Sequence, residues 1–204
     1  YFKLRFSLSY RDVEELLSIR GVKVNHASIQ RWVFKFTPLV EQQFRKRKKS
    51  VGKSWRLDET YIKVKGEWKY LYRAVDKEGN TVDFLLTKRR QRISAQKFLI
   101  KAIENNVNPE LINIDKSGAN KAAIKLYNRR NYSNIKIRQC KYLNNIVEQD
   151  HRMIKWRIML GLGFKEFESA KRTISGIEVV RMIKKNQLVN PESSTYKSFI
   201  SLAS

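Results

Sequence analysis

Three acidic residues, Asp58, Asp115 and Glu148, stand at positions where a folded chain could bring them together. Asp58 lies in the β-forming run WRLDETYIKV, and Asp115 directly follows the short apolar run Leu111–Ile114. Ligand groups in sheets flanked by helices gather at the carboxyl ends of strands. Mg²⁺ needs carboxylate ligands, and two such ions about 3.5–4 Å apart can hold the attacking and leaving oxygens of a phosphoryl transfer. The pattern therefore indicates a candidate site for metal-dependent chemistry at phosphate.

Glu148 opens a predicted helix that carries basic side chains on the same face. Glu148, His151 and Arg152 are spaced i, i+3 and i+4, and Lys155 lies one step further along. A carboxylate on this face could hold a metal ion while the neighbouring cations contact phosphates. The three basic residues are therefore candidate DNA contacts.

Each of these residues also has an ordinary structural role open to it. Asp58 could be a surface acid of a strand, and Asp115 could cap a helix, because Asp is favoured at N-caps. Glu148 could form a surface ion pair with Arg152, worth about 0.3–0.5 kcal/mol. His151 could be a structural histidine. Spacing alone does not decide between these roles and a metal site.

The charge of the chain favours a polyanionic partner. Lys and Arg number 43 against 19 Asp and Glu, which gives a net charge of +24 and a pI near 10.2. Each phosphate that a cation neutralises releases counterions, so such an excess favours nucleic acid. A solvated basic surface, a ribosomal protein and a membrane-surface protein are the alternatives that composition leaves open.

Composition also limits which metal the chain could bind and which cellular compartment suits it. One cysteine, Cys140, excludes an internal disulfide and suits a reducing cytoplasm. With only two histidines besides, the chain cannot build a Cys/His zinc site, so any catalytic metal must be a hard cation held by carboxylates. No apolar run approaches the roughly 18 residues that cross a bilayer, and we expect no membrane association.

The N-terminal region is predicted as two helices joined by a turn. Ser9 and Asp12 match a capping box, Asn25 can cap the second helix, and Pro38 is expected just beyond its end. Such a pair indicates a helix-turn-helix, whose second helix would enter the major groove, with a plain helical hairpin as an equal alternative. The residues off the apolar stripe that could face DNA are Ser28, Gln30, Arg31 and Lys35.

After a basic run at residues 45–49 the pattern changes from helical to extended. Further elements follow in the order strand 55–64, strand 68–75, strand 81–86, helix capped by Ser94, strand Leu111–Ile114, helix 119–128, strand 135–137, and helices to about residue 185 with a break near 161–163. The segment from Asn190 is expected to be loosely ordered. This order fits an α/β fold with a mixed sheet flanked by helices.

Two strings, LDETYIKVKG and YLNNIVEQDHR, carry a specific resemblance to a known family. Together with LSYRDVEELL, VNHASIQRWV, NIDKSGAN and SAKRTISGIEVVRMIKKNQL, they resemble the transposases of the bacterial insertion sequence six group. These belong to the Asp-Asp-Glu (DDE) superfamily and are related to retroviral integrases. The resemblance covers nearly the whole chain, and it implies a ribonuclease H-like catalytic core preceded by a small all-α helix-turn-helix domain.

The resemblance also assigns roles to the residues singled out above. It makes Asp58, Asp115 and Glu148 the catalytic, metal-binding residues, and their separations of 57 and 33 residues are close to those of the family. The basic face after the glutamate is matched by His151, Arg152 and Lys155. Trp156 departs from the family, which usually has Arg there, and the residues after about Gln187 do not match.

The activity that the resemblance implies is cleavage of insertion-sequence ends and strand transfer to target DNA, with two Mg²⁺ ions for which Mn²⁺ can substitute. The implied partners are terminal inverted repeats, target DNA and further copies of the chain, in the bacterial cytoplasm at the nucleoid. The alternatives are a catalytically decayed copy, a helix-turn-helix regulator that only binds DNA, and a ribonuclease H-like nuclease that cleaves without joining.

We expect four segments along the chain. Residues 1–44 form a helix-turn-helix region that is incomplete at its N-terminus, and residues 45–53 form a basic linker. Residues 54–188 form the ribonuclease H-like DDE domain, and residues 189–204 form a polar tail.

Overall fold

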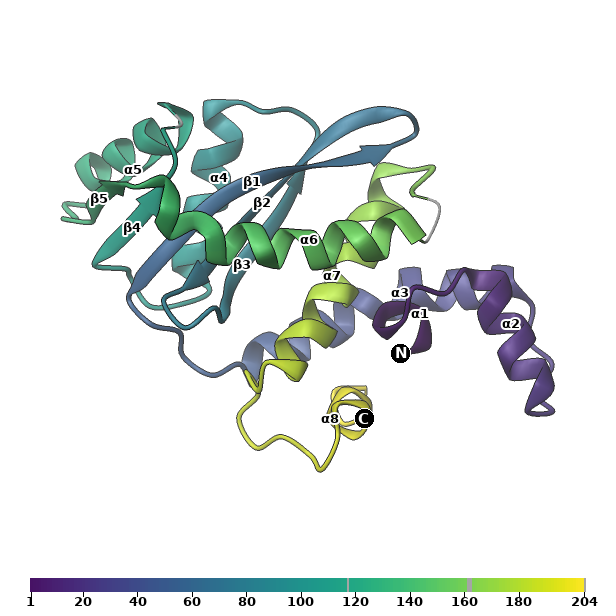
Figure 1. Cartoon of the computed structure of the whole chain (residues 1–204). Coiled ribbons are helices and arrows are strands. Elements are labelled where there is room, and N and C mark those ends of the chain that lie inside the picture. The colour runs from purple at the N-terminus through teal and green to yellow at the C-terminus, as the bar shows by residue number, and fades with distance from the viewer. Residues whose placement is uncertain (117, 161–162, 204) are drawn as a thin grey trace. The chain divides into compact units, whose positions relative to one another are not determined.

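The computed structural model describes residues 1–116, 118–160 and 163–203 (Figure 1). It contains two compact units, which are described separately. The sheet unit comprises Ser50–Met153, and the helical unit comprises Tyr1–Lys49 together with Ile154–Ser204. The helix break predicted near 161–163 falls partly outside the described residues.

The sheet unit is built on a five-stranded mixed sheet with the strand order β3-β2-β1-β4-β5. β1 (Ser54–Val64), β2 (Glu67–Asp76) and β3 (Thr81–Thr87) pair antiparallel, because only short turns join them. β4 (Leu111–Ile114) and β5 (Lys136–Gln139) continue the sheet in parallel. The predicted α/β fold with a mixed sheet is confirmed, and the strands lie close to their predicted positions.

One face of the sheet carries the apolar core. Side chains alternate between the faces of a strand, so Trp55 of β1 enters a core formed with α4 (Arg92–Glu104) and α5 (Gly118–Arg130). Asp58 falls on the opposite face, which the first turns of α6 (Asn145–Leu160) cross in Figure 1. The polar residues singled out in the sequence thus lie away from the apolar core.

The start of α4 differs from the prediction. The sequence predicts Ser94 as its N-cap, but the helix begins at Arg92, with Gln91 in the cap position. The Ser94 hydroxyl instead donates a hydrogen bond to the carbonyl oxygen of Arg89, at 2.8 Å. Its side chain therefore fixes the turn between β3 and α4 from within the first turn of the helix.

The helical unit contains α1 (Phe2–Arg5), α2 (Tyr10–Ile19), α3 (His26–Lys46), α7 (Phe167–Lys184) and α8 (Thr195–Ile200). In this unit α2 packs on α3, and α3 packs on α7. No helix in the described part of the chain is long and apolar enough to cross a membrane.

Both predicted caps in this unit are confirmed. Ser9 and Asp12 form a reciprocal capping box at the start of α2. Asn25 caps α3 by accepting a hydrogen bond from the backbone N–H of Ala27, at 2.8 Å. The turn between them contains Gly21 at φ +78°, a backbone conformation that favours glycine.

The predicted end of α3 is wrong. Pro38 was expected beyond the helix, yet α3 continues through it to Lys46. A proline removes the N–H that would bond the carbonyl four residues earlier, here that of Phe34. The Arg172 guanidinium of α7 donates to that carbonyl oxygen at 2.6 Å and lies over the Phe34 ring, 3.6 Å from its centre. A tertiary contact thus replaces the bond that Pro38 cannot make.

The segment after α3 and the C-terminal tail are also more ordered than expected. The backbone N–H of Lys49 donates to Gln187 O, and that of Val189 donates to Arg47 O. In the tail, Ser194 caps α8, and Phe199 of that helix is buried. These segments are mostly polar, and only a few of their apolar residues are buried. The sequence therefore suggested loose order.

Candidate active site

The two aspartates are placed by the pairing of adjacent parallel strands. β1 and β4 are in register with Ser54 opposite Leu111 and Arg56 opposite Asn113. Continued by two residues, this register brings Asp115 level with Asp58. Neighbouring strands lie about 4.8 Å apart, and residues level with each other point to the same face. This continuation would put the two carboxylates on one face beyond the end of β4, and the charge of Asp115 does act on Asp58.

Two buried asparagines connect the segment before Glu148 to the same strand. The side-chain amide of Asn113 in β4 donates to Asn144 Oδ1 at 2.7 Å and to the backbone carbonyl of Cys140 at 2.9 Å. Asn144 ends the short helix η1 (Lys141–Asn144), after which α6 begins. These bonds fasten the start of α6, and with it Glu148, beside the strand that leads to Asp115.

A buried ion pair holds α6 against the sheet. The Arg73 guanidinium of β2 contacts the Asp150 carboxylate of α6, and their side chains are 0% and 11% exposed. Arg73 is the partner of Asp58 in the pairing of β1 and β2. His151, the next residue of α6, has its Nδ1 atom 3.5 Å from Asp58 Oδ2. Asp58 thus has the His151 imidazole beside its carboxylate, and Arg73 as its backbone partner on β2.

Like charges act on Asp58. Its pKa is raised to about 7, first by burial and then by the charge of Glu59, with Asp115 and Glu148 adding to the effect. Asp115 is half-buried and Glu148 is exposed. Among the described residues, no three carboxylate, imidazole or thiol groups are gathered closely enough to share one metal ion. The acids of the predicted triad therefore influence each other without forming a closed ligand set.

Glu59 has surroundings quite different from those of its neighbour Asp58. Its carboxylate forms an ion pair with Arg90, from the turn between β3 and α4, and accepts a hydrogen bond from Asn120 of α5 at 3.0 Å. The Glu59 side chain is 5% exposed. Glu59 therefore ties α5 and the Arg90 turn to β1, a role that the sequence analysis did not assign.

The predicted DNA-contacting residues differ in their exposure. Arg152 and Lys155 are exposed, whereas His151 is 5% exposed and lies beside Asp58. On α3 in the helical unit, Gln30, Arg31 and Lys35 are exposed and Ser28 is half-buried, and Arg31 donates to Ser28 Oγ at 3.0 Å.

Comparisons with known proteins agree with this geometry. A family model described as a DDE domain matches residues 52–187. The transposase for insertion sequence-like element IS431mec of Staphylococcus aureus is 40% identical over 191 residues, covering 91% of this chain and 83% of that protein. The transposase for insertion sequence element IS257 in transposon Tn4003, also from Staphylococcus aureus, has the same identity and coverage.

This chain belongs to the DDE transposases of the insertion sequence six group. The resemblance drawn from LDETYIKVKG and YLNNIVEQDHR is thereby confirmed. The transposase is a DNA-cutting polynucleotidyl transferase by class.

Solved structures support the fold of the transposase. The catalytic core domain of HTLV-2 integrase, in its trimeric form with magnesium, aligns with a TM-score of 0.51 at 17% identity, covering 66% of this chain and 88% of that one. The catalytic core domain of BIV integrase aligns with a TM-score of 0.51 at 16% identity, covering 74% and 95%. The ribonuclease H-like core expected from the sequence is therefore confirmed.

The polar partners around the acids are what sequence reasoning missed. Asn113, Arg73 and Asp150 carry no individual signal, because a lone polar residue in a strand or helix has many possible partners. The two adjacent asparagines before Glu148, in the string YLNNIVEQDHR, could have indicated a polar contact there, since an asparagine that becomes buried needs hydrogen-bond partners.

Proposed function

We propose that the transposase cleaves the ends of an insertion sequence and joins the released 3′-hydroxyl to target DNA, using two Mg²⁺ ions held by Asp58, Asp115 and Glu148. The observation that carries this proposal is the register of β1 and β4, whose continuation by two residues would put the two aspartates level on one face. The raised pKa of Asp58 also supports the proposal, because the charges of Asp115 and Glu148 contribute to it.

The donor set suits hard divalent cations. Oxygen ligands from carboxylates are what Mg²⁺ and Mn²⁺ prefer. The mutual repulsion of three carboxylates, visible in the pKa of Asp58, is the cost that a bound cation would remove. Divalent ions bound there would supply a deprotonated water as nucleophile and stabilise the charge of the reacting phosphate.

The remaining residues of the site have positioning and binding roles in this proposal. His151 orients the Asp58 carboxylate, and the Arg73–Asp150 ion pair fixes the helix that carries Glu148. Exposed Arg152 and Lys155 contact phosphates of the bound DNA. The protein contributes positioning and charge stabilisation, and no side chain acts as a covalent nucleophile.

DNA recognition is assigned to the N-terminal helices. In this proposal α2 and α3 bind the terminal inverted repeats, with Ser28, Gln30, Arg31 and Lys35 on the contacting helix. Residues 1–44, 45–53, 54–188 and 189–204 keep the roles of binding region, basic linker, catalytic domain and tail. Several copies of the chain assemble on paired element ends, as the relatives' activity as transposases suggests.

The proposal is tested by a strand-transfer assay with labelled element-end DNA and Mg²⁺ or Mn²⁺. We expect the parent protein to give joined product and Asp115→Asn to give none while still binding DNA. The matched control is Glu110→Gln, which removes an exposed carboxylate just before the same strand, where its ion pair within the described part of the chain is with exposed Lys53. Metal-dependent joining by Asp115→Asn would refute the site, as would unchanged Mn²⁺ binding after all three acids become amides.

A further inference from the structure

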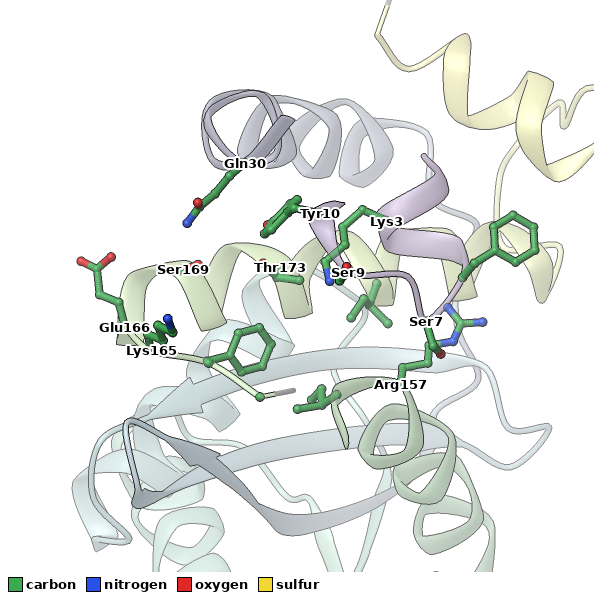
Figure 2. A pocket seen from close by; sticks show the side chains of 15 residues that line it. Lys3, Ser7, Ser9, Tyr10, Gln30, Arg157, Lys165, Glu166, Ser169 and Thr173 are labelled. Carbon is green, nitrogen blue, oxygen red and sulfur yellow. The ribbon is translucent and has the colours of Figure 1, made fainter. Parts of the chain in front are cut away.

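A cavity of about 350 Å³ lies within the helical unit (Figure 2). Residues between α1 and α2 form one wall, and residues 163–166 and α7 form another. Gln30 of α3 and Arg157 near the end of α6 complete the lining. This volume is within the roughly 300–1,000 Å³ range of sites for small organic groups.

Three cations line this cavity: Arg157 is buried, Lys3 is half-buried and Lys165 is exposed. Arg157 is 8% exposed, and its guanidinium donates to Leu4 O at 3.1 Å. The Lys3 ammonium donates to Leu8 O at 2.7 Å. Among the described residues, neither forms an ion pair with a carboxylate. The third cation, Lys165, is exposed, and so is the one carboxylate of the lining, Glu166, which follows it in the chain.

The surroundings of Arg157 favour an anion. Burial lowers its pKa, and the neighbouring charges of Arg181 and Arg5 lower it further, against an opposing contribution from Glu178. Burial also lowers the pKa of Lys3. Clustered, partly desolvated cations are stabilised when a ligand brings negative charge to them.

The same cavity offers surfaces for a planar, partly polar group. The rings of Phe6, Tyr10 and Phe164 line it, and Figure 2 shows Tyr10 together with the hydroxyls of Ser9 and Thr173. Ser7 Oγ, another lining atom, is buried and has no hydrogen-bond partner among the described residues. Aromatic faces suit the stacking of a nucleobase, and hydroxyls suit its polar edge.

We propose that this cavity binds one unpaired nucleotide of a DNA end, with its phosphate near Lys3, Arg157 and Lys165 and its base against the aromatic rings. Duplex DNA is too wide to enter a space of this size, so the occupant must be unstacked from its neighbours. The inference rests on the proposed action of the transposase on DNA ends, because that action places such a nucleotide within reach.

The test compares two labelled duplexes with the full chain. One ends in a single unpaired 2-aminopurine nucleotide, and the other is blunt with 2-aminopurine paired at the end. We expect at least fivefold tighter binding of the unpaired end, with quenched fluorescence, because stacking of one base contributes roughly a factor of five or more. Equal binding of the two duplexes would overturn the proposal.

Two variants and a control locate the site. Ser169→Trp places an indole in the cavity from α7 and is expected to reduce the preference to about one, with blunt-end binding unchanged. Lys165→Gln is expected to reduce the preference several-fold, and it carries the test if circular dichroism shows Ser169→Trp misfolded. Lys171→Gln, an exposed residue of α7 outside the cavity lining, is the matched control. An unchanged preference in both cavity variants would overturn the assignment.

Two further arms separate the sources of the signal. In the first, 1 mM deoxyadenosine monophosphate competes with the labelled duplexes. If it abolishes the quenching and the protein shows no preference between the duplexes, the cavity binds free mononucleotides, and a DNA-end site is overturned. Strand transfer is measured in parallel. A parent protein that joins DNA but shows no preference for the unpaired end overturns this inference alone, whereas loss of joining in the parent bears on the proposed function.

Discussion

At the scale of single residues, the Asp58 carboxyl lies where ionisation is opposed by burial and by three nearby acids. Its side chain is 16% exposed, so water screens these effects only in part. An acid whose pKa is raised to about 7 is partly protonated at neutral pH in the metal-free protein. The folded state is therefore sensitive to pH at one residue of the proposed site.

Asp58→Asn is predicted to stabilise the metal-free protein by an amount that grows with pH. The unfolded chain loses this proton near pH 3.8 and the folded chain near pH 7, so ionisation favours unfolding between these values. Relative to the parent, the free energy of unfolding of the variant should be unchanged near pH 4 and higher by roughly 2–4 kcal/mol at pH 8. Urea unfolding in EDTA measures this.

The control for this experiment is Glu110→Gln, whose expected effect on the free energy of unfolding has the opposite sign. The Lys53 side chain lowers the pKa of the exposed Glu110 carboxyl, so Glu110→Gln removes an interaction that stabilises the fold above its ordinary pKa. A stability difference for Asp58→Asn that does not change with pH would contradict the burial of an ionisable acid at this position.

The residues of the proposed triad could be predicted from sequence, but their supporting contacts could not. Asp58 and Asp115 stand out because specific strings surround them and because acids at strand ends are conspicuous in a basic chain. The bond between Asn113 and Asn144 depends on how a strand and a helix start meet across 31 residues. The buried position of His151 depends on which face of α6 meets the sheet, and helical spacing does not supply that face.

At the scale of elements, α3 shows how a neighbour can override a local signal. Pro38 is a reliable helix stop in isolation, yet the Arg172 guanidinium replaces the missing bond at Phe34 O. Periodicity correctly located α3 and its cap, and it failed at the end because the compensating group lies 138 residues away in sequence.

Arg172→Ala is predicted to destabilise the helical unit by about 1 kcal/mol, because Phe34 O loses its donor and the ring loses its cation. In a Pro38→Ala background the helix can supply that hydrogen bond itself, so the cost of Arg172→Ala should be smaller. Thermal unfolding of the two single variants and the double variant measures this coupling. Strictly additive effects would show that Arg172 does not compensate for the proline.

Gly176 of α7 marks a second close approach of elements. A Cβ atom placed there would lie 2.7 Å from Leu4 Cδ1 and 2.9 Å from Thr37 Cγ2. We predict that Gly176→Ala lowers the free energy of unfolding by about 1–3 kcal/mol, although alanine favours helix formation. Gly118→Ala in α5, where a Cβ meets nothing within 4 Å, should be neutral or mildly stabilising in the same denaturation measurement. Stabilisation by both changes would show that α1 can move away from α7 at little cost.

At the scale of the whole molecule, the net charge of +24 should govern how DNA affinity responds to salt. If 6–10 phosphates are contacted, affinity for duplex DNA should fall by about 10³–10⁵ between 50 and 200 mM salt. Fluorescence anisotropy across this range gives the slope, and hence the number of phosphates neutralised. Neutralising both Arg152 and Lys155 should reduce the slope by roughly 2. A slope near zero would contradict electrostatic binding to the DNA backbone.

The order of elements was enough to predict the mixed sheet, but it did not reveal how the chain divides into compact units. Periodicity finds the apolar face of α7 without naming the element that this face meets. In the structure, Ile154–Ser204 groups with Tyr1–Lys49, and Ser50–Met153 stands between them in sequence. Packing of α3 on α7 is long-range, and no local pattern in either helix specifies the other.

The packing of α3 on α7 has a consequence for biosynthesis. α7 begins about 120 residues after α3 ends, which is roughly 6–24 s of translation. During that interval Val40 and Phe44, both buried in the finished protein, face water or a chaperone. The strands of the sheet unit emerge before α7 does. The sheet of the nascent transposase can therefore form before α7 has been synthesised and can pack against α3.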